Sequence, residues 1–250
     1  MASISVVVIA HNEAGNVRAC LESVRRQSLQ PDEIILIAHN CTDDTVTIAK
    51  EFSEVRIVEL FGLAGPIFAR ARGFEEARGD IVACIDGDSY ALTKNWLQRL
   101  IFLLSDLEFL AVGGGVWLTG ALRPLLMSLD FFWLKPIYKP FVNKILRLAG
   151  LAQDDTWKCH FWGANFAIRK SVYEKIGGLM PLVQLKQKLG LSFDAEDLYL
   201  ALMVSRLGKV GIDPWAVVVS RATKTNWKIR IRDQGQDKQK LIDTILGKPE

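Results

Sequence analysis

The stretch IVACIDGDSY (81–90) runs apolar for five residues and then ends on two carboxylates, Asp86 and Asp88, separated by one glycine. A short apolar run bounded by turn residues is typical of a buried strand. Two like charges at the end of such a strand repel each other, and burial disfavours the ionised form of both. The pattern therefore predicts that a positive charge, or a group that needs neutralising, lies between the two aspartates.

Around this stretch, short β-type runs alternate with helical patterns. The strands and helices predicted in the first half cover, in order, 4–10, 14–27, 33–38, 42–52, 55–60, 65–77 and 80–85. Strands that alternate with helices of this length indicate βαβ units. The predicted fold class is therefore α/β, with a mostly parallel sheet flanked by helices.

After residue 95 the pattern is looser. The elements predicted there are a helix over 94–105, a glycine-broken strand over 109–118, a strand or hairpin with a Gly163 turn over 158–169, an amphipathic helix over 195–208 and a strand over 216–220. We expect a single domain over 1–250, made of a first half (1–95), a second half (96–220) with an apolar-basic helical insertion (121–157), and a basic tail (221–250) that is partly mobile.

Composition excludes several classes of protein. The 31 basic and 28 acidic residues are too balanced for a nucleic-acid binder. The four cysteines lack CxxC spacing, which argues for free thiols in a reducing compartment and against zinc. We see neither a signal-peptide pattern nor 18 consecutive apolar residues, so we expect a cytoplasmic protein.

Four consecutive predicted strands end in polar or glycine-rich turns. These turns are HNE (11–13), HNCTDD (39–44), GLAGP (62–66) and DGDS (86–89). Because ligands bind at the carboxyl ends of the strands in open parallel sheets, the four turns predict one constructed site. Surface loops are polar in any protein, so no single turn identifies the site.

The ordered set of motifs resembles the family 2 glycosyltransferases, which have the GT-A fold. The resemblance runs from residue 4 to about 212 and covers VVVIAHNEAGNV (6–17), AHNCTDDT (38–45), GLAGPIFARARG (62–73), DGDS (86–89) and AEDL (195–198). It implies an inverting transfer of one sugar from a nucleoside diphosphate sugar to a hydroxyl acceptor, either a saccharide or lipid-linked. The QxxRW signature of processive polysaccharide synthases is absent, so the resemblance implies a non-processive enzyme.

The resemblance also implies roles for particular residues. Asp88 would contact a divalent cation, Mn²⁺ or Mg²⁺, and Asp86 would be shared between the ribose and metal-bound water; carboxylate oxygens suit such hard cations. Asp197 would be the general base, with Glu196 as its substitute or as an acceptor ligand. The other nucleotide-sugar-binding residues that the resemblance implies are Ala10, His11, Asn12, Glu13, His39, Arg70 and Gly87.

Taken alone, the same residues permit structural roles. The two aspartates of DGDS could cap the turn before the next helix. Glu196 and Asp197 begin a predicted helix, where acids favour the macrodipole. Arg70 could be a surface residue of its helix, paired with Glu75 or Glu76.

Two positions depart from the family pattern. His39 stands where relatives usually carry an aspartate that meets the pyrimidine or ribose, so the identity of the nucleotide stays open. Many relatives supply a further metal ligand, often histidine, near the last strand, where this chain has Ser220 and Arg221. His160 is a spare candidate for that ligand, but a lone histidine beside aromatic residues is more often packed.

Residues 121–151 admit two interpretations. Their aromatic and basic side chains are interleaved, as in an interfacial membrane patch, which would fit a lipid-linked acceptor and a peripheral location on the inner face of the membrane. Alternatively, the aromatic residues pack on the sheet or on a partner subunit. The residues concerned are Phe131, Phe132, Trp133, Tyr138 and Phe141 with Arg123, Lys135, Lys139, Lys144 and Arg147.

Two other functions stay open. A haloacid-dehalogenase-type phosphatase also uses a DxD, but after the first strand of its fold, whereas three βα units precede DGDS here. A degenerate, non-catalytic relative that binds nucleotide or membrane is the second. The hypothesis of a Rossmann oxidoreductase has less support than either, because no GxGxxG motif follows the first strand.

Overall fold

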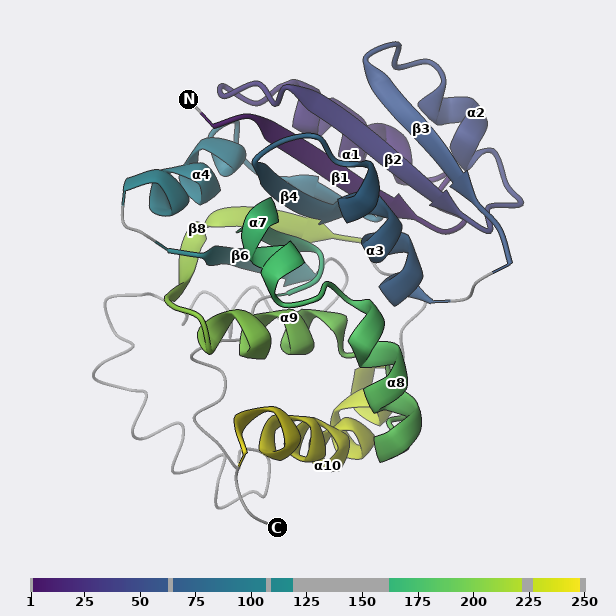
Figure 1. The fold of residues 1–250 in the computed structure, drawn as a ribbon. Helices are drawn as coiled ribbons and strands as arrows, with labels where there is room; N and C mark the ends of the chain where they lie inside the picture. The colour runs from purple at the N-terminus through teal and green to yellow at the C-terminus, as the bar shows by residue number, and fades with distance from the viewer. Residues whose placement is uncertain (1, 63–64, 107–108, 119–161, 222–226, 248–250) are drawn as a thin grey trace.

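A curled sheet with helices on both faces forms the centre of the protein (Figure 1). The structure, a computed structural model, describes residues 2–62, 65–106, 109–118, 162–221 and 227–247. The predicted insertion at 121–157, with its aromatic and basic side chains, lies outside the described residues, and so does His160.

Eight strands make up the sheet in the part of the chain that the structure describes. They are β1 (Ile4–Ala10), β2 (Glu33–His39), β3 (Val55–Leu60), β4 (Ile81–Asp86), β5 (Ser89–Ala91), β6 (Ala111–Leu118), β7 (Asn165–Arg169) and β8 (Val210–Ser220). The helices are α1 (Val17–Arg25), α2 (Thr45–Ala49), α3 (Pro66–Glu76), α4 (Trp96–Asp106), α7 (Lys170–Lys175), α8 (Met180–Leu189), α9 (Glu196–Ser205) and α10 (Trp227–Leu246).

The strands follow the order β3-β2-β1-β4-β7-β6-β8-β5. Four of their pairings are parallel and link β3, β2, β1 and β4 in one block and β6 with β8 in another. The other three pairings are antiparallel and involve β7, between β4 and β6, and β5, at the edge beside β8. The prediction of an α/β fold with a mostly parallel sheet is confirmed.

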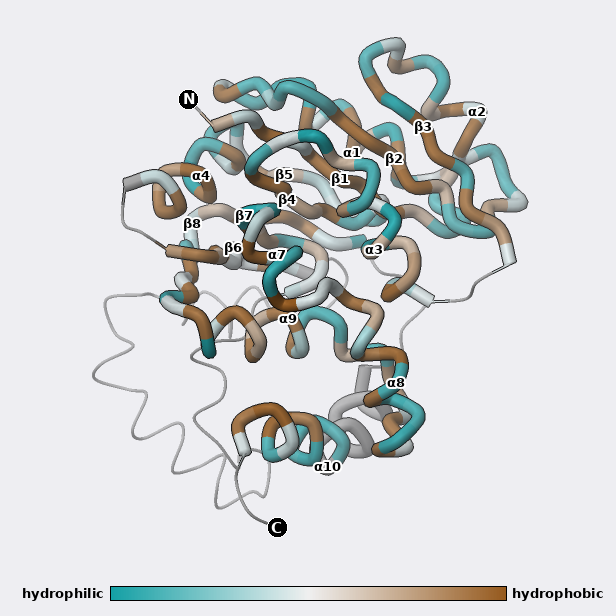
Figure 2. The backbone as a smooth tube through the Cα atoms, viewed as in Figure 1, coloured by the Kyte–Doolittle hydropathy of each residue, from teal (hydrophilic) through white to brown (hydrophobic). Residues whose placement is uncertain are grey.

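Apolar residues fill both faces of the sheet because alternate side chains of a strand point to opposite sides. On β1, Val6 and Val8 pack toward α1 and α4, whereas Val7 packs toward α3 and α9. Figure 2 shows hydrophobic segments in the central strands and hydrophilic segments in many of the outer loops and helices. Burying one such side chain fully stabilises the fold by roughly 1.5–3 kcal/mol, so the two layers hold the strand ends in place.

Most predicted elements are confirmed to within three residues at each end. Two others differ in length for a physical reason. Helix α2 is only five residues long, because Thr45–Ile48 is a run of β-branched side chains, which are poor helix formers. Strand β8 begins six residues before the predicted 216–220 and contains a bulge opposite Gly114 and Gly115, the predicted glycine break of β6.

The predicted tail contains a helix, α10, which the sequence did not predict. Leu241, Ile242 and Ile245 of this helix are buried against the layer that contains α8 and α9. The apolar residues of the tail are few and stand among polar ones, so the composition did not indicate a packed helix. Helices α7 and α8 were not predicted either. Among the described residues, no helix is long and apolar enough to cross a membrane.

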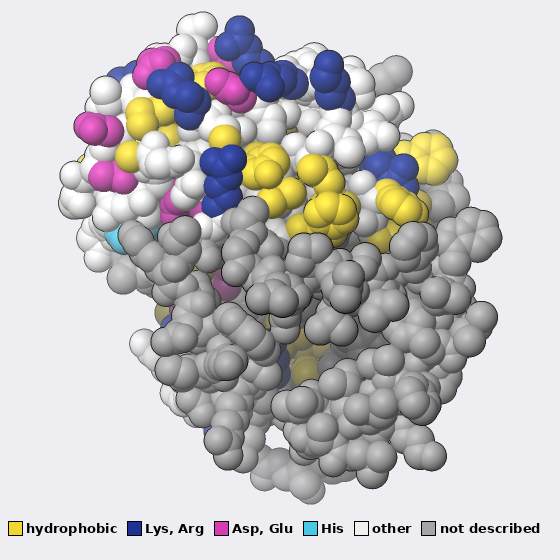
Figure 3. Space-filling model, turned by 180° about the vertical axis from the view of Figure 1, so that it is seen from behind, with side chains coloured by type: hydrophobic (Ala, Val, Ile, Leu, Met, Phe, Trp, Pro, Cys, Tyr) yellow, Lys and Arg dark blue, Asp and Glu magenta, His cyan; other side chains and the backbone are white. Residues whose placement is uncertain are grey.

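Some large apolar side chains stay exposed. Figure 3 shows hydrophobic side chains gathered across the rear face, below a region of mixed charges. The most exposed of the large hydrophobic residues are Phe61, Phe102, Trp162 and Trp215. These four side chains come from four separate segments of the chain.

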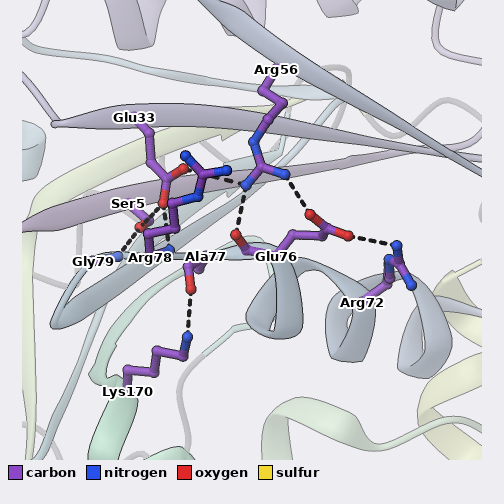
Figure 4. Close-up of polar contacts among 9 residues, drawn as sticks. All are labelled: Ser5, Glu33, Arg56, Arg72, Glu76, Ala77, Arg78, Gly79 and Lys170. Carbon is purple, nitrogen blue, oxygen red and sulfur yellow. Dashed lines mark hydrogen bonds and ion pairs between the residues drawn. The ribbon is translucent and has the colours of Figure 1, made fainter.

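The amino ends of the first strands are closed by a polar network (Figure 4). Glu33 accepts hydrogen bonds from the Ser5 hydroxyl at 2.6 Å and from the Arg78 N–H at 2.6 Å. Arg56 pairs with Glu33 at 3.3 Å and also with Glu76. This network lies at the end of the sheet opposite the predicted site.

Candidate functional site

The strand order reverses direction between β1 and β4, and the turns after these two strands meet at that point. In open α/β sheets, a crevice forms where the strand order reverses. The Gly87 N–H donates a 2.8 Å hydrogen bond to the carbonyl of Ile9, the last residue but one of β1. A Cβ at Gly87 would lie 2.9 Å from the Ala10 Cβ, so only glycine lets the DxD turn approach β1 this closely.

The loop after β1 is tied to the loop after β2. Asn12 has a left-handed backbone with φ 56°, and its Oδ1 accepts a 2.7 Å hydrogen bond from the Thr42 N–H. The Glu13 N–H donates to the Thr45 hydroxyl at 2.7 Å. A non-glycine residue in this conformation is uncommon and persists only where its surroundings hold it. The two loops therefore form one rigid wall of the site.

The two histidines predicted at the site belong to this wall. His11 Nδ1 donates a 2.7 Å hydrogen bond to the His39 carbonyl. His39 itself is buried, and its Nε2 lies 3.1 Å from Asn40 Nδ2. The His39 main chain thus orients the His11 ring, and both histidines lie in the same pair of loops as Asn12 and Glu13.

Asp88 carries a negative charge that the protein only partly compensates. Its Oδ1 accepts hydrogen bonds from the Ser89 hydroxyl at 2.8 Å and the Ser220 hydroxyl at 3.4 Å. Burial, and then the charge of Asp86, raise the pKa of Asp88 to about 6. Such an excess of negative charge fits a hard divalent cation, which prefers carboxylate oxygens.

The protein supplies few other metal ligands in this region. Among the described residues, no three His, Cys, Asp or Glu side chains converge on a point that could hold a metal. Ser220, at the position where relatives usually supply a ligand, donates to Asp88, and the Arg221 N–H donates to the Asp88 carbonyl at 2.8 Å. A cation bound to the two aspartates would therefore complete its coordination with oxygen atoms of a bound substrate or of water.

Arg70 is buried between two acids from distant segments. Its side chain is 1% exposed, and its Nη2 lies 3.1 Å from Asp86 Oδ1 and 3.6 Å from Glu196 Oε1. The alternative of a surface arginine paired with Glu75 or Glu76 is therefore wrong. Arg72 makes those surface pairs instead, because it points to the other side of α3.

Glu196 and Asp197 begin α9 after a strained residue, Ala195, whose φ is 47°. Burial raises the pKa of Glu196 to about 7, against the opposing effect of Arg70. Asp197 Oδ2 accepts a 3.3 Å hydrogen bond from the Gly163 N–H, and its Oδ1 accepts from the Leu198 N–H at 2.7 Å. The second bond satisfies a donor of the first helical turn, so Asp197 also has a structural role at this terminus.

The sequence indicated a turn at Gly163 but not its place in the site. Gly163 is buried, and a Cβ on it would lie 2.9 Å from Arg70 Nη2 and 3.4 Å from Glu196 Oε1. Its N–H bonds to Asp197, so this residue touches three of the predicted site residues. The signal available in the sequence was the small-residue pair Gly163-Ala164 just before a buried strand.

Comparison with known families shows what the chain resembles. The family model described as "Glycosyl transferase family 2" matches residues 5–177. The "Probable glycosyltransferase YdaM" of Bacillus subtilis is 27% identical over 244 aligned positions, and the alignment covers 90% of this chain and 52% of that protein. The "Uncharacterized glycosyltransferase YibD" of Escherichia coli is 38% identical over 107 residues, 41% of this chain and 31% of that protein. The chain thus spans about half the length of YdaM.

Two solved structures share the fold. The mannosyltransferase PcManGT from Pyrobaculum calidifontis, solved with GDP-Man and Mn²⁺, has a TM-score of 0.65 at 21% identity and covers 92% of this chain and 60% of that one. Glucosyl-3-phosphoglycerate synthase from Mycobacterium tuberculosis, solved with Mn²⁺, UDP-glucose and phosphoglyceric acid, has a TM-score of 0.63 at 18% identity. It covers 100% of this chain and 81% of that one. At these identities the two likenesses establish the GT-A fold alone.

Proposed function

The chain belongs to glycosyl transferase family 2, and we propose that it moves one sugar from a nucleoside diphosphate sugar to a hydroxyl acceptor with inversion. One observation carries the proposal. Two acidic pairs that are more than a hundred residues apart, Asp86 with Asp88 and Glu196 with Asp197, lie at one edge of the sheet, and Arg70 joins them.

The donor would lie against the first pair and the wall formed by the loops after β1 and β2. Asp88 and Asp86 would hold Mn²⁺ or Mg²⁺, which supplies positive charge to the departing diphosphate when bound. The uncompensated charge of Asp88 supports this assignment. Both solved relatives described above were solved with Mn²⁺ and a nucleotide sugar, which favours the same kind of donor complex.

The acceptor would lie against α9. Asp197 is our candidate for the general base: it takes the proton of the acceptor hydroxyl while that oxygen bonds to the anomeric carbon. In the same step the bond from that carbon to the diphosphate oxygen breaks, so the configuration inverts. The Gly163 N–H holds the Asp197 carboxylate in place. Glu196, closer to Arg70, is better placed to orient the acceptor than to act as the base.

His11, Asn12, Glu13 and His39 are our candidates for holding the base and ribose, because they form the wall beside the DxD turn. Membrane contact through 121–151 and a lipid-linked acceptor stay predictions from the sequence, since those residues lie outside the described part of the chain. A cytoplasmic location stays a prediction as well.

The proposal can be tested with a thermal-shift panel of UDP, GDP, CDP and dTDP, each with and without Mn²⁺. A ligand at about one hundred times its Kd adds roughly 2.7 kcal/mol of stability, which gives a clear rise in Tm. We expect one nucleotide to stabilise the wild type only with metal. Asp88→Ala should lose this effect, and Asp243→Ala, on the distant helix α10, should keep it.

The alternatives predict other outcomes. If no nucleotide raises the Tm under any metal condition, the proposed donor site is not functional. If a nucleotide binds with metal, but the corresponding nucleotide sugar is neither transferred to any acceptor nor hydrolysed, the chain is a degenerate binder. Release of inorganic phosphate from a phosphate ester without sugar transfer would identify the DxD phosphatase.

A further inference from the structure

The most deeply buried charged side chain among the described residues is Arg70. It is almost fully buried on α3, with its Cζ 5.6 Å from the centroid of the Phe166 ring. Within the described residues, its Nε and Nη1 are buried and have no hydrogen-bond partner. A buried cation is stable only if it is paired with charge, so its acidic neighbours decide whether it can stay there.

Those neighbours come from two different parts of the site. The same nitrogen, Nη2, contacts Asp86 at the end of β4 and Glu196 at the start of α9. An arginine side chain keeps its charge at any ordinary pH, so these two acids supply the paired negative charge that the buried guanidinium needs. The cation therefore draws the donor-side acid and the acceptor-side acid toward one point.

Gly163 makes this arrangement possible. Only a residue without a side chain leaves room for Nη2, since a Cβ here would lie 2.9 Å from it. The N–H of the same glycine bonds to Asp197, the proposed base. Arg70 thus lies between the acid that faces the donor and the turn that holds the base.

Resting on the proposed function, we infer that Arg70 is a positioning residue that couples the donor site to the acceptor site and is not a ligand of the diphosphate. With 1% of its side chain exposed, it has no free surface to offer to a phosphate. Its guanidinium contacts both Asp86 and Glu196 and so fixes their separation. The position of Asp86 against the nucleotide and the position of α9 against the acceptor therefore depend on each other. A misplacement of about 1 Å in such a site can lower the rate by about 100-fold.

The test compares Arg70→Lys, Arg70→Met and Gly163→Ala with the wild type. Gly163→Ala keeps Arg70 and every acid but displaces the guanidinium. The matched control is Arg72→Lys, on the exposed side of α3. Four quantities are measured: the affinity for UDP or GDP with Mn²⁺, by calorimetry; the kcat and KM for hydrolysis of UDP-glucose or GDP-mannose; and the Tm.

For a positioning role, we expect Arg70→Lys and Gly163→Ala to bind the nucleotide within about threefold of the wild type, while kcat falls by about 10- to 100-fold. Arg70→Met should be worse than Arg70→Lys, because lysine restores part of the charge. If Arg70→Lys does not fold, the Gly163→Ala result decides alone.

Two results would overturn the inference. A loss of nucleotide affinity of more than tenfold in Arg70→Lys or Gly163→Ala would make Arg70 part of the donor-binding surface. An unchanged kcat with only a lower Tm would make it purely structural. If the wild type itself binds no nucleotide, the proposed function fails and this inference fails with it.

Discussion

The two ends of the sheet carry the same ingredients, one arginine between two acids, with opposite electrostatic results. At the amino ends of the strands, Arg56 lies between Glu33 and Glu76 (Figure 4). At the carboxyl ends, Arg70 lies between Asp86 and Glu196. In the first cluster, hydrogen bonds and opposite charges compensate the acids fully. In the second, Glu196 stays poorly compensated.

The difference lies in how many hydrogen bonds each acid receives. Burial alone would raise the pKa of Glu33, but bonds from Ser5, the Arg78 N–H and Arg56 outweigh it and hold the pKa below its ordinary value. Hydrogen bonding by Arg56 likewise lowers the pKa of Glu76. Glu196 receives too little compensation, and burial raises its pKa to about 7. A buried acid with a strongly raised pKa is typical of functional sites, whereas an acid whose charge is compensated by hydrogen bonds is typical of structural ones.

The largest effect should follow from Asp197→Asn. The variant removes the proposed base but leaves its hydrogen bond from Gly163 possible, so we expect a 10²- to 10⁴-fold lower kcat, roughly the contribution of a general base. Nucleotide affinity should not change. The measurement is release of nucleoside diphosphate from the nucleotide sugar that the wild type binds. A kcat within threefold of the wild type would remove Asp197 from the mechanism.

The next effect concerns stability and pH at the functional end of the sheet. The pKa of Glu196 rises from 4.5 to about 7 on folding, so its contribution to stability is fully present below about pH 4.5 and is lost as the pH rises to 7. At 1.36 kcal/mol per unit, the wild type should lose roughly 3 kcal/mol between these values through this group.

In Glu196→Gln that loss should be absent. Urea unfolding of both proteins at pH 5 and pH 8 measures it, and the variant should be the more stable of the two at pH 8. An equal pH dependence in the two proteins would show that Glu196 is not the group responsible.

At the opposite end, Glu33→Gln should have the reverse effect on stability. The pKa of Glu33 is lowered on folding, so its stabilisation is present above its unfolded pKa and is lost as the pH falls through its folded pKa. The variant should unfold about 1–3 kcal/mol more easily at pH 7, because charged hydrogen bonds are weakened. Its kcat should equal that of the wild type. A large fall in kcat would mean that this network also serves the site.

The smallest effect should follow from Arg72→Ala. Arg72 pairs with Glu75 and Glu76 on the exposed side of α3, and such pairs contribute about 0–1 kcal/mol. Thermal unfolding should therefore shift by no more than a few degrees, and less at high salt. A larger shift would show that the balance of the Arg56 cluster depends on Arg72 through Glu76.

The sequence predicted local features well and long-range pairing poorly. The apolar runs located β1 to β4, because a buried strand needs little beyond a continuous apolar stretch. The motif order predicted that Asp86, Asp88, Glu196 and Asp197 share a site. The resemblance included Arg70 among the site residues, but its burial between two acids could not be predicted, since its helical spacing allowed either a surface or a buried side chain.

The misses have a related cause. Gly163 matters because of the space beside Arg70 and Glu196, which only the packed structure reveals. Helix α10 was missed because its apolar residues, Leu241, Ile242 and Ile245, stand among polar ones and become a stripe only once they face α8 and α9. Both misses follow from tertiary contacts, which a local sequence pattern does not show.

The most direct test of the contrast between the two ends of the sheet is an NMR titration of the side-chain carboxyl carbons in protein labelled with ¹³C-glutamate. Glu196→Gln and Glu33→Gln assign the two signals. We expect the Glu196 carboxyl to titrate near pH 7 and the Glu33 carboxyl below its ordinary value of 4.5. Two carboxyls that both titrate near 4.5 would contradict the contrast, and with it the electrostatic argument for the site at the carboxyl ends.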